Sequence, residues 1–451
     1  MTKQLPWWKE PTRKQWAAFS AAWVGWVLDA FDFTIYIVVA HEIMKEFDVP
    51  AVAVHGSLTL TLLVRLAGGS IAGWMADRWG RRLPLMLSLV WFATFDALIF
   101  FAPTFTWIVV FRTLFGFGMG AEWTAGTALA MESFPARSRK IASGLLQAGW
   151  PVGFLLAAAT AHFVVPAWGW RAMFLIAAVP ALLVIPIRMF VPDEMSKVPK
   201  SEVSKGAIKD LMAPGVFRML VLGSLVMALG FIVYYGMATF LMGLSMEAGA
   251  TVAEARFNTI WFNVGMLVGV LCAGAIANRY GVVVALVTPA LLMVPALPLF
   301  VGLYPSMLAV GAFLGGCLGV GYSGVTPVLT TSLFPAHVRA RAIGLVYHVG
   351  ALIAAFVPTL VPWLVSTTTM SLATTVMIVV GSGLIMMSAA VLVLRKTITV
   401  PTETGVPASV LAEATSPGGV PSPERRDQLA MAVAAVDHEV ARATERRVTV
   451  G

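Results

Sequence analysis

The sequence predicts an all-α membrane protein with twelve transmembrane helices in two pseudo-symmetric six-helix bundles. Three observations support this prediction: the composition, a series of apolar runs and an internal repeat. Of 451 residues, 59% are hydrophobic and 12% are charged, whereas soluble domains carry about 25% charged residues. The mean hydropathy of +0.84 leaves too little polar surface for a water-soluble globule. The 26 Phe and 15 Trp exclude a disordered chain, and only two cysteines exclude a disulfide-stapled secreted domain.

Continuous apolar runs predict the individual helices. A helix needs about 20 largely apolar residues to cross roughly 30 Å of hydrocarbon, and alternating polarity, which is typical of membrane strands, is missing. The first run is too long for a signal peptide and contains two Asp, so we expect it to remain in the membrane. The predicted spans are 17–40, 54–76, 83–102, 107–130, 141–164, 171–191, 218–243, 257–277, 282–303, 306–331, 341–364 and 370–394.

Lysine and arginine gather in alternate loops. The opposite loops carry only Lys45, Arg171 and Arg256. The excess of positive charge marks cytoplasmic loops, so we expect both termini and the central loop to be cytoplasmic, with the chain in the cell (inner or plasma) membrane. The basic residues of this side are Lys3, Lys9, Arg13, Lys14, Arg78, Arg81, Arg82, Arg137, Arg139, Lys140, Lys197, Lys200, Lys205, Lys209, Arg279, Arg339, Arg341, Arg395 and Lys396. Their scatter in short clusters argues against a nucleic-acid surface, despite the formal charge of +8.

The chain divides into four predicted parts. They are an N-terminal six-helix bundle at 1–191, a cytoplasmic central loop at 192–217, a C-terminal six-helix bundle at 218–396 and a cytoplasmic polar tail at 397–451. The first part of the tail is rich in Pro, Thr, Ser and Gly, which is typical of a flexible linker. The segment 423–448 has a helical apolar stripe, which fits either a solvated cytosolic helix or a partner-binding element.

The two halves repeat at nearly the same shift. Seven residues recur at a shift of 200. They are Phe134, Pro135, Ala136, Arg139, Ala142, Gly144 and Leu145, and their counterparts are Phe334, Pro335, Ala336, Arg339, Ala342, Gly344 and Leu345. At a shift of 201, Gly73, Ala76, Arg78 and Gly80 recur as Gly274, Ala277, Arg279 and Gly281. The repeat predicts a duplicated six-helix unit with both copies in the same orientation, and such halves rock about a site near the membrane midplane.

One run of this repeat resembles a known signature. Gly73-Trp-Met-Ala-Asp77-Arg78-Trp-Gly80-Arg81-Arg82 is similar to the loop between helices 2 and 3 of the major facilitator superfamily. The resemblance implies a gate, in which Asp77 meets the N-terminal end of helix 11 and Arg78 or Arg81 meets Glu132. The alternative is that the arginines only set the topology.

Further runs resemble the sialic-acid/proton symporters and the related lactate permeases. They are Trp23 to Tyr36, Gly118 to Trp123, Glu132 to Pro135 and Tyr347 to Leu352. The resemblance implies transport of a carboxylate coupled to protons.

Charged residues inside the predicted spans, away from the terminal turns, lie only in the first half. Each costs about 2.5–3.5 kcal/mol on insertion scales, so such a residue normally faces protein or water and has a function. The set comprises Asp29, Asp32, Arg65, Asp96, Arg112 and Glu122, with Arg188 near the end of a span. For Asp96 we favour a structural role.

Three of these acids are candidates for proton coupling. Asp29 and Asp32 are three residues apart, hence on one helix face, and like charges in a low dielectric favour a protonated carboxyl. Glu122 lies among glycines that allow close helix approach, and in the resembling symporters this acid faces the cavity. The alternative for each acid is a permanent ion pair with a neighbouring cation.

An anionic substrate needs a cationic partner in the membrane. Arg65 is our first choice and Arg112 our second, because a guanidinium stays charged and matches a carboxylate with two parallel hydrogen bonds. A permanent pair with a nearby acid is the competing interpretation. The neutral candidates for substrate contact are Tyr36, Gln147, Trp150, Tyr234, Tyr235, Asn258, Asn263, Tyr322, Tyr347 and His348.

Together these features predict a proton-coupled symporter that imports a small organic carboxylate, lactate-like or sialic acid, by alternating access. The alternatives are an aromatic-acid/proton symporter and a proton-driven exporter of small organic molecules. No nucleophile–base pair, metal-ligand spacing, P-loop or dinucleotide motif occurs, so we expect no enzyme activity, no cofactor and no metal. The expected partners are the anionic substrate, protons and the lipid bilayer, with no nucleic acid. The expected state is a monomer, the default of the superfamily.

Overall fold

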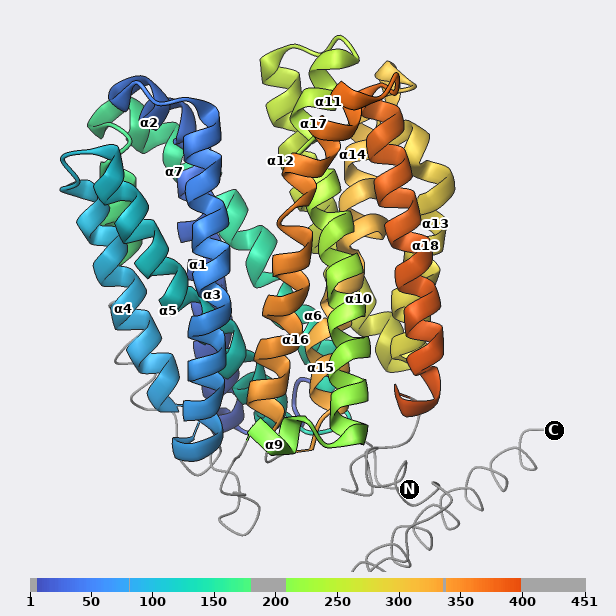
Figure 1. Cartoon of the computed structure of the whole chain (residues 1–451). Coiled ribbons are helices and arrows are strands. Elements are labelled where there is room, and N and C mark those ends of the chain that lie inside the picture. The colour runs from blue at the N-terminus through green and yellow to red at the C-terminus, as the bar shows by residue number, and fades with distance from the viewer. Residues whose placement is uncertain (1–5, 81, 180–207, 336–337, 399–451) are drawn as a thin grey trace, which may run out of the picture.

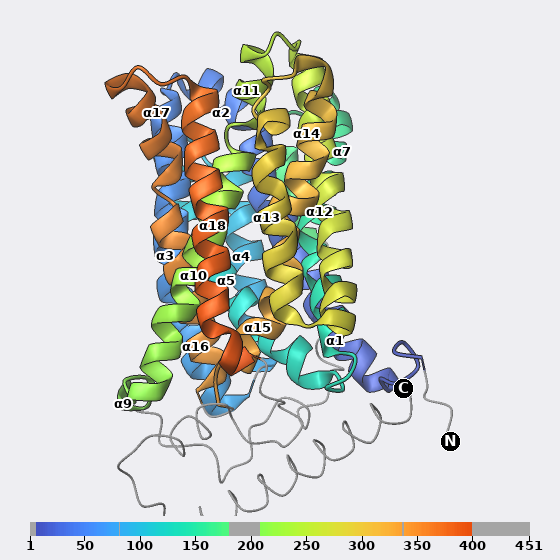
Figure 2. The same ribbon diagram turned by 90° about the vertical axis from the view of Figure 1, so that its right-hand side faces the viewer.

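The computed structural model describes residues 6–80, 82–179, 208–335 and 338–398, and this part of the chain is built of helices and their connections. Figure 1 shows two groups of long, roughly parallel helices, one from each half of the sequence, and Figure 2 shows the second group in front of the first. The first group holds α1 to α7, and the second holds α10 to α18. The view in Figure 1 therefore shows the two bundles that the apolar runs predict.

Among the described residues, the first group consists of α1 to α7 and a further helical stretch at 172–179. Its first helix begins at a capping box, in which Thr12 and Gln15 exchange side-chain and backbone hydrogen bonds. The helices are α1 (Arg13–Val38), α2 (Ala40–Phe47), α3 (Ala51–Trp79), α4 (Arg82–Phe100), α5 (Phe105–Ser133), α6 (Arg139–Gln147) and α7 (Gly149–Trp168). Helix α5 packs against both α3 and α4, while α1 packs against α7.

The second group contains more interruptions. A second capping box, Thr251 with Glu254, starts its longest uninterrupted helix. The elements are α9 (Ile208–Leu211), α10 (Pro214–Ala238), α11 (Leu241–Glu247), α12 (Val252–Tyr280), α13 (Val282–Phe300), η2 (Pro305–Met307), α14 (Leu308–Leu314), η3 (Gly315–Val320), η4 (Gly321–Val325), α15 (Thr326–Ser332), α16 (Arg339–Ala354), α17 (Val357–Thr367) and α18 (Leu372–Ile398).

The predicted spans agree well with the helices. Ten helical segments of the described part are long and apolar enough to cross a membrane. Helix α5 supplies the predicted span 107–130. The predicted span 171–191 is helical at 172–179 and otherwise lies outside the described residues, as do Arg188, most of the central loop and the tail beyond residue 398.

The two halves meet at one end of the molecule. We call it the basic end, because it holds the start of α1 at Arg13, the α3–α4 turn beside Arg82 and the starts of α6 and α16 at Arg139 and Arg339. In Figure 1 the ribbons of the halves converge toward this lower end and diverge toward the opposite one. The contacts between halves there join α3 to α16 and α6 to α12.

Glycines of the internal repeat make this contact possible. A Cβ at Gly144 of α6 would lie 2.5 Å from the Val270 carbonyl oxygen and 3.1 Å from the Gly274 Cα of α12. A Cβ at Gly73 of α3 would lie 2.8 Å from the Arg341 Cα of α16. Because Gly73 corresponds to Gly274 in the repeat, related glycines bring the backbones together on both sides of the pseudo-symmetry axis.

At the opposite end of the first half, hydrogen bonds to Glu46, which lies outside the predicted spans, join α2 to the residues after α7. Glu46 of α2 accepts hydrogen bonds from Trp170 Nε1 at 2.6 Å and from Arg171 Nη2 at 2.8 Å. Partial burial acts to raise the pKa of Glu46, but the hydrogen bonds from Arg171 and Trp170 outweigh it and leave the pKa below its ordinary value. The carboxylate is therefore ionised at neutral pH and holds α2 against the α7 end.

Candidate functional site

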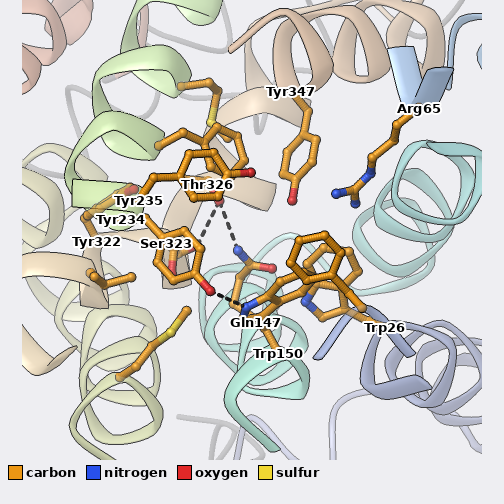
Figure 3. A pocket seen from close by; sticks show the side chains of 15 residues that line it. Trp26, Arg65, Gln147, Trp150, Tyr234, Tyr235, Tyr322, Ser323, Thr326 and Tyr347 are labelled. Atoms are coloured by element: carbon orange, nitrogen blue, oxygen red, sulfur yellow. Dashed lines mark hydrogen bonds between the residues drawn. The ribbon is translucent and has the colours of Figure 1, made fainter. Parts of the chain in front are cut away.

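A cavity lies between the two halves, with about 580 Å³ of space that no atom fills. Eight of its fifteen lining residues are aromatic, and Figure 3 shows them on several sides of the cavity. The lining consists of Trp26, Phe33, Arg65, Gln147, Trp150, Met227, Phe231, Tyr234, Tyr235, Met266, Val320, Tyr322, Ser323, Thr326 and Tyr347.

Arg65 is the only charged residue among these described lining residues. Its side chain comes from the middle of α3, is 3% exposed and has its Cζ 5.2 Å from the centroid of the Tyr347 ring of α16. Nε and Nη2 are buried without a hydrogen-bond partner in the described structure. Figure 3 shows the guanidinium facing the cavity beside the Tyr347 ring. The cavity thus offers hydrogen-bond donors and a positive charge to a ligand.

Two polar contacts join the halves across the cavity wall. Trp150 Nε1 of α7 donates to the Tyr234 hydroxyl of α10 at 3.0 Å. Gln147 Nε2 at the end of α6 donates to Thr326 Oγ1 at 3.4 Å, and Thr326 donates to the Ser323 carbonyl oxygen at 2.8 Å. Both contacts are drawn in Figure 3.

An aromatic partition separates this cavity from a smaller one. The Trp26 ring of α1 lies 4.6 Å from that of Trp123 and 5.0 Å from that of Trp150, centroid to centroid, and Trp123 lies 4.3 Å from Tyr347. Trp26 also lines the second cavity, which encloses about 180 Å³ and contains Glu122. Glu122 is 1% exposed and accepts a hydrogen bond from Ser88 at 3.4 Å. This acid therefore lies behind the tryptophans, outside the lining of the main cavity.

A second group of charges is buried inside the first half. We call it the Asp32 cluster, consisting of Asp32, Tyr36, Asp96 and Arg112. Arg112 Nη1 lies 3.4 Å from Asp96 Oδ1, with both side chains fully buried, and its guanidinium lies over the Tyr36 ring at 4.7 Å. Both carboxylate oxygens of Asp32 are buried without a hydrogen-bond partner in the described structure. Arg112 and Tyr36, which we expected at the substrate, belong to this cluster and not to the cavity lining.

Asp29 lies between the cluster and the cavity. It is fully buried and interacts electrostatically with Asp32 on one side and with Tyr347 on the other. Because Tyr347 lies beside Arg65, Asp29 connects the cation of the cavity with the carboxyls of the cluster. The spacing of three residues on α1 produces this arrangement.

At the basic end, Glu132 of α5 pairs with Arg339 of α16 at 3.2 Å. We expected Arg78 or Arg81 as its partner. Arg78 instead lies over the rings of Trp74 and Trp79, at 5.6 and 5.9 Å, while Arg81 and the Asp77 side chain lie outside the described residues. Gly80 ends α3 with a φ of 93°, which favours glycine, and Arg82 begins α4. The Glu132–Arg339 pair joins one half to the other.

The remaining candidates occupy other places. The Asn263 amide donates to the Thr259 carbonyl of its own helix at 2.9 Å, and Asn258 donates to Ser245 at 3.2 Å. His348 Nε2 lies 3.1 Å from the Gly120 carbonyl oxygen, as a contact between α16 and α5. These three residues are absent from the described cavity lining, whereas Gln147, Trp150, Tyr234, Tyr322 and Tyr347 belong to it.

Comparison with known proteins identifies relatives over most of the chain. The family model for the Major Facilitator Superfamily matches residues 22–255. The sialic acid transporter NanX of Escherichia coli is 26% identical over 352 residues, which cover 76% of this chain and 86% of NanX. The cis,cis-muconate transport protein of Acinetobacter baylyi is 28% identical over 365 residues, which cover 77% of this chain and 87% of that protein.

A solved structure shares the fold. The proton:xylose symporter XylE, with bound 6-bromo-6-deoxy-D-glucose, superposes with a TM-score of 0.74 at 18% sequence identity. The match covers 89% of this chain and 99% of XylE. The two-bundle architecture predicted from the repeat is confirmed by this likeness.

Proposed function

Because this chain belongs to the Major Facilitator Superfamily, and so is a multi-pass membrane transporter and not an enzyme, we propose that it imports a small organic carboxylate together with a proton. The observation that carries the proposal is Arg65, a buried cation with two unpaired nitrogens in an aromatic cavity between the halves. A guanidinium out of water needs an anion, and a carboxylate matches its fork of donors.

The similar transporters support a carboxylate. NanX is named for sialic acid and the Acinetobacter baylyi protein for cis,cis-muconate, and both compounds are organic acids. The lining of this chain's cavity supports a flat molecule within that class, because eight of its fifteen residues are aromatic. Aromatic side chains stack favourably on planar conjugated groups. The aromatic or unsaturated acid is therefore the better fit, ahead of a polyhydroxylated sugar acid.

The buried carboxyls supply a place for the proton. Asp29, Asp32 and Asp96 lie near one another, with Arg112 in the same cluster and Arg65 at the cavity. Three acids with two arginines leave an excess negative charge in a low-dielectric site, and one bound proton removes it. Asp32 is the best candidate, because Arg112 already pairs with Asp96 and Asp29 faces the Tyr347 side.

Transport proceeds by rocking of the halves. The basic end faces the cytoplasm in this proposal, because cytoplasmic loops carry the excess of Lys and Arg. The structure then corresponds to a state closed toward the cytoplasm, in which Glu132 and Arg339 join the halves. A monoanion that moves with one proton is electroneutral, so uptake draws about 1.4 kcal/mol from each unit of pH difference.

The test is uptake of radiolabelled acids into proteoliposomes, with and without an imposed inward proton gradient. The panel contains benzoate, cis,cis-muconate, lactate and sialic acid. We expect at least one acid to accumulate only with the gradient, and Asp32→Asn to abolish that accumulation. Equal uptake with and without the gradient would overturn proton coupling, and uptake of none of the acids would overturn the substrate class.

Export of apolar compounds is the alternative with the same fold. An exporter of uncharged molecules has no use for a cation at its binding site, so Arg65→Ala would leave its transport intact. The unpaired nitrogens of Arg65 favour the import of acids over this alternative.

A further inference from the structure

We infer that Gln147 is a specificity-determining residue that accepts a hydrogen bond from a hydroxyl group of the transported acid. The inference rests on the proposed function and adds to it a second polar group on the substrate, in addition to the carboxylate. The supporting observation is the hydrogen bonding of the Gln147 amide at the cavity wall.

The orientation of the Gln147 amide follows from its neighbour. The Thr326 hydroxyl has a single proton, which it donates to the Ser323 carbonyl oxygen at 2.8 Å. Toward Gln147, at 3.4 Å, the same oxygen can therefore only accept a hydrogen bond. The amide nitrogen must face Thr326, since the opposite orientation would place two acceptors against each other.

The amide oxygen is thereby turned into the cavity. Gln147 Oε1 is buried and has no hydrogen-bond partner in the described structure, and the residue is 6% exposed. Figure 3 shows the oxygen on the cavity side of the amide. Leaving a buried acceptor without a hydrogen bond costs free energy. A ligand with a donor at this position should therefore bind more tightly than a ligand without one.

The neighbouring groups restrict what that donor can be. The carboxylate of the substrate is an acceptor only, so it belongs at Arg65, whose Nε and Nη2 also lack partners. Gln147 comes from α6 and Arg65 from α3, and Figure 3 shows them facing the cavity from different sides. The matching ligand is a planar acid with its carboxylate at one position and a hydroxyl at another, held between aromatic rings.

The experiment compares three acids in proteoliposomes: benzoate, 3-hydroxybenzoate and 4-hydroxybenzoate. The readout is the ratio of kcat/KM for the better hydroxybenzoate to kcat/KM for benzoate within each variant, so that a general loss of transport cancels. In the wild type we expect a ratio of about 10, because one buried hydrogen bond contributes roughly the free energy that corresponds to a tenfold change. In Gln147→Leu the ratio should fall to about 1, because leucine fills similar space without an acceptor.

A matched pair at Thr326 tests the orienting step. Thr326→Val removes the acceptor that holds the amide nitrogen, so the ratio should fall toward that of Gln147→Leu. Thr326→Ser keeps the hydroxyl and should keep the wild-type ratio. This pair decides the question even if Gln147→Leu fails to insert into the membrane.

The outcomes separate this inference from the function on which it rests. If the wild type takes up no acid of either panel, the proposed function itself is wrong. If it transports carboxylates but takes up benzoate and the hydroxybenzoates equally, or takes up none of these three, the role of Gln147 is overturned. A ratio that persists in both Gln147→Leu and Thr326→Val also overturns it.

Discussion

A single guanidinium, that of Arg65, gives the cavity its positive charge. Arg65 is 3% exposed, and the rings around it cannot neutralise its charge beyond the contact with Tyr347. A bound carboxylate would form charge-assisted hydrogen bonds there, which are about twice as strong as those between neutral groups. Sequence patterns predicted this residue, since a cation in the middle of an apolar helix is rare and functional.

Replacement of Arg65 should therefore reduce substrate affinity strongly. We expect Arg65→Ala to lower kcat/KM for acid uptake by about 100-fold or more, in the range found when one member of a buried charge pair is removed. Arg65→Lys should recover only part of this loss, because an ammonium lacks the planar fork. Arg256→Ala, at an exposed position of α12, is the control. Uptake by Arg65→Ala at the rate of the control would exclude Arg65 from the binding site.

The Asp96–Arg112 pair has a different role, which stability measurements can isolate. Because both side chains are fully buried, Asp96→Asn leaves the Arg112 charge with Asp32 as its remaining carboxyl neighbour in the cluster, and should lower the free energy of unfolding by up to about 3–5 kcal/mol. The double variant Asp96→Asn/Arg112→Met removes that charge as well and should regain much of the loss. Thermal unfolding in detergent measures both. If the single and double variants are equally destabilised, the charge left on Arg112 is not the cause of the lost stability.

Sequence reasoning found part of the cavity lining. It predicted Arg65, because a charged group is rare in an apolar run, and it predicted the neutral residues Gln147, Trp150, Tyr234, Tyr235, Tyr322 and Tyr347. It did not predict Trp26 and Phe231, because aromatic residues occur throughout the spans and no periodicity separates those facing a cavity from those in the core. Arg112 lies beside Asp96, and the sequence does not reveal that these two side chains come close enough to pair.

At the scale of the helix, interruptions place the polar residues of the second half. The segment that was predicted as one span at 306–331 contains a π-helical turn, η3, followed by a 3₁₀ turn, η4. Glycines at several positions allow this change of winding, and π turns often occur at functional sites. Tyr322 and Ser323 of η4 and Thr326 of α15 thereby line the cavity.

The ends of helices were easier to predict than their breaks. Capping boxes such as Thr251 with Glu254 mark a helix start in the sequence. The interruption between α6 and α7, at Ala148, lies within one predicted span, 141–164. Pro151 explains it, because proline lacks the backbone N–H that would bond the Gln147 carbonyl oxygen.

Close packing of α6 on α12 should hold the basic end shut. A methyl group at Gly144 would meet the Val270 carbonyl oxygen at 2.5 Å, and overpacking of this kind costs about 1–3 kcal/mol. We expect Gly144→Ala to shift the population away from the closed state by about 5- to 150-fold. The measurement is the rate at which a short bifunctional reagent cross-links Glu132→Cys to Arg339→Cys, with Cys272 and Cys317 replaced by Ala.

The matched control is Gly56→Ala on α3, where an added methyl group has nothing within 4 Å. This variant should cross-link at the parental rate. If Gly144→Ala also cross-links at that rate, the contact between α6 and α12 does not control the gate.

At the scale of the whole molecule, two similar halves enclose one asymmetric site. The first half contributes the charge of Arg65, while the second contributes hydroxyl and aromatic groups such as Tyr234 and Tyr347. The repeat predicted the paired contacts at the basic end. It did not predict Arg339 as a partner of Glu132, because the sequence does not show which charges of the two halves come together.

Locking the basic end should stop transport. In the variant with Glu132→Cys and Arg339→Cys, cross-linking fixes the halves together where the ion pair now holds them. Uptake should fall to the level of empty liposomes and return when a cleavable reagent is reduced. The single variant Glu132→Cys, treated with the same reagent, controls for modification alone. Full transport by the cross-linked protein would contradict alternating access through this end.

The most direct test of the central claim measures protons themselves. Proteoliposomes in a weakly buffered medium, without any imposed gradient, receive an acid that the protein transports, and a pH electrode records the outside solution. The account predicts an alkaline shift on addition of the acid, which disappears in Asp32→Asn. Uptake of the labelled acid with no change of external pH, in wild-type protein, would contradict it.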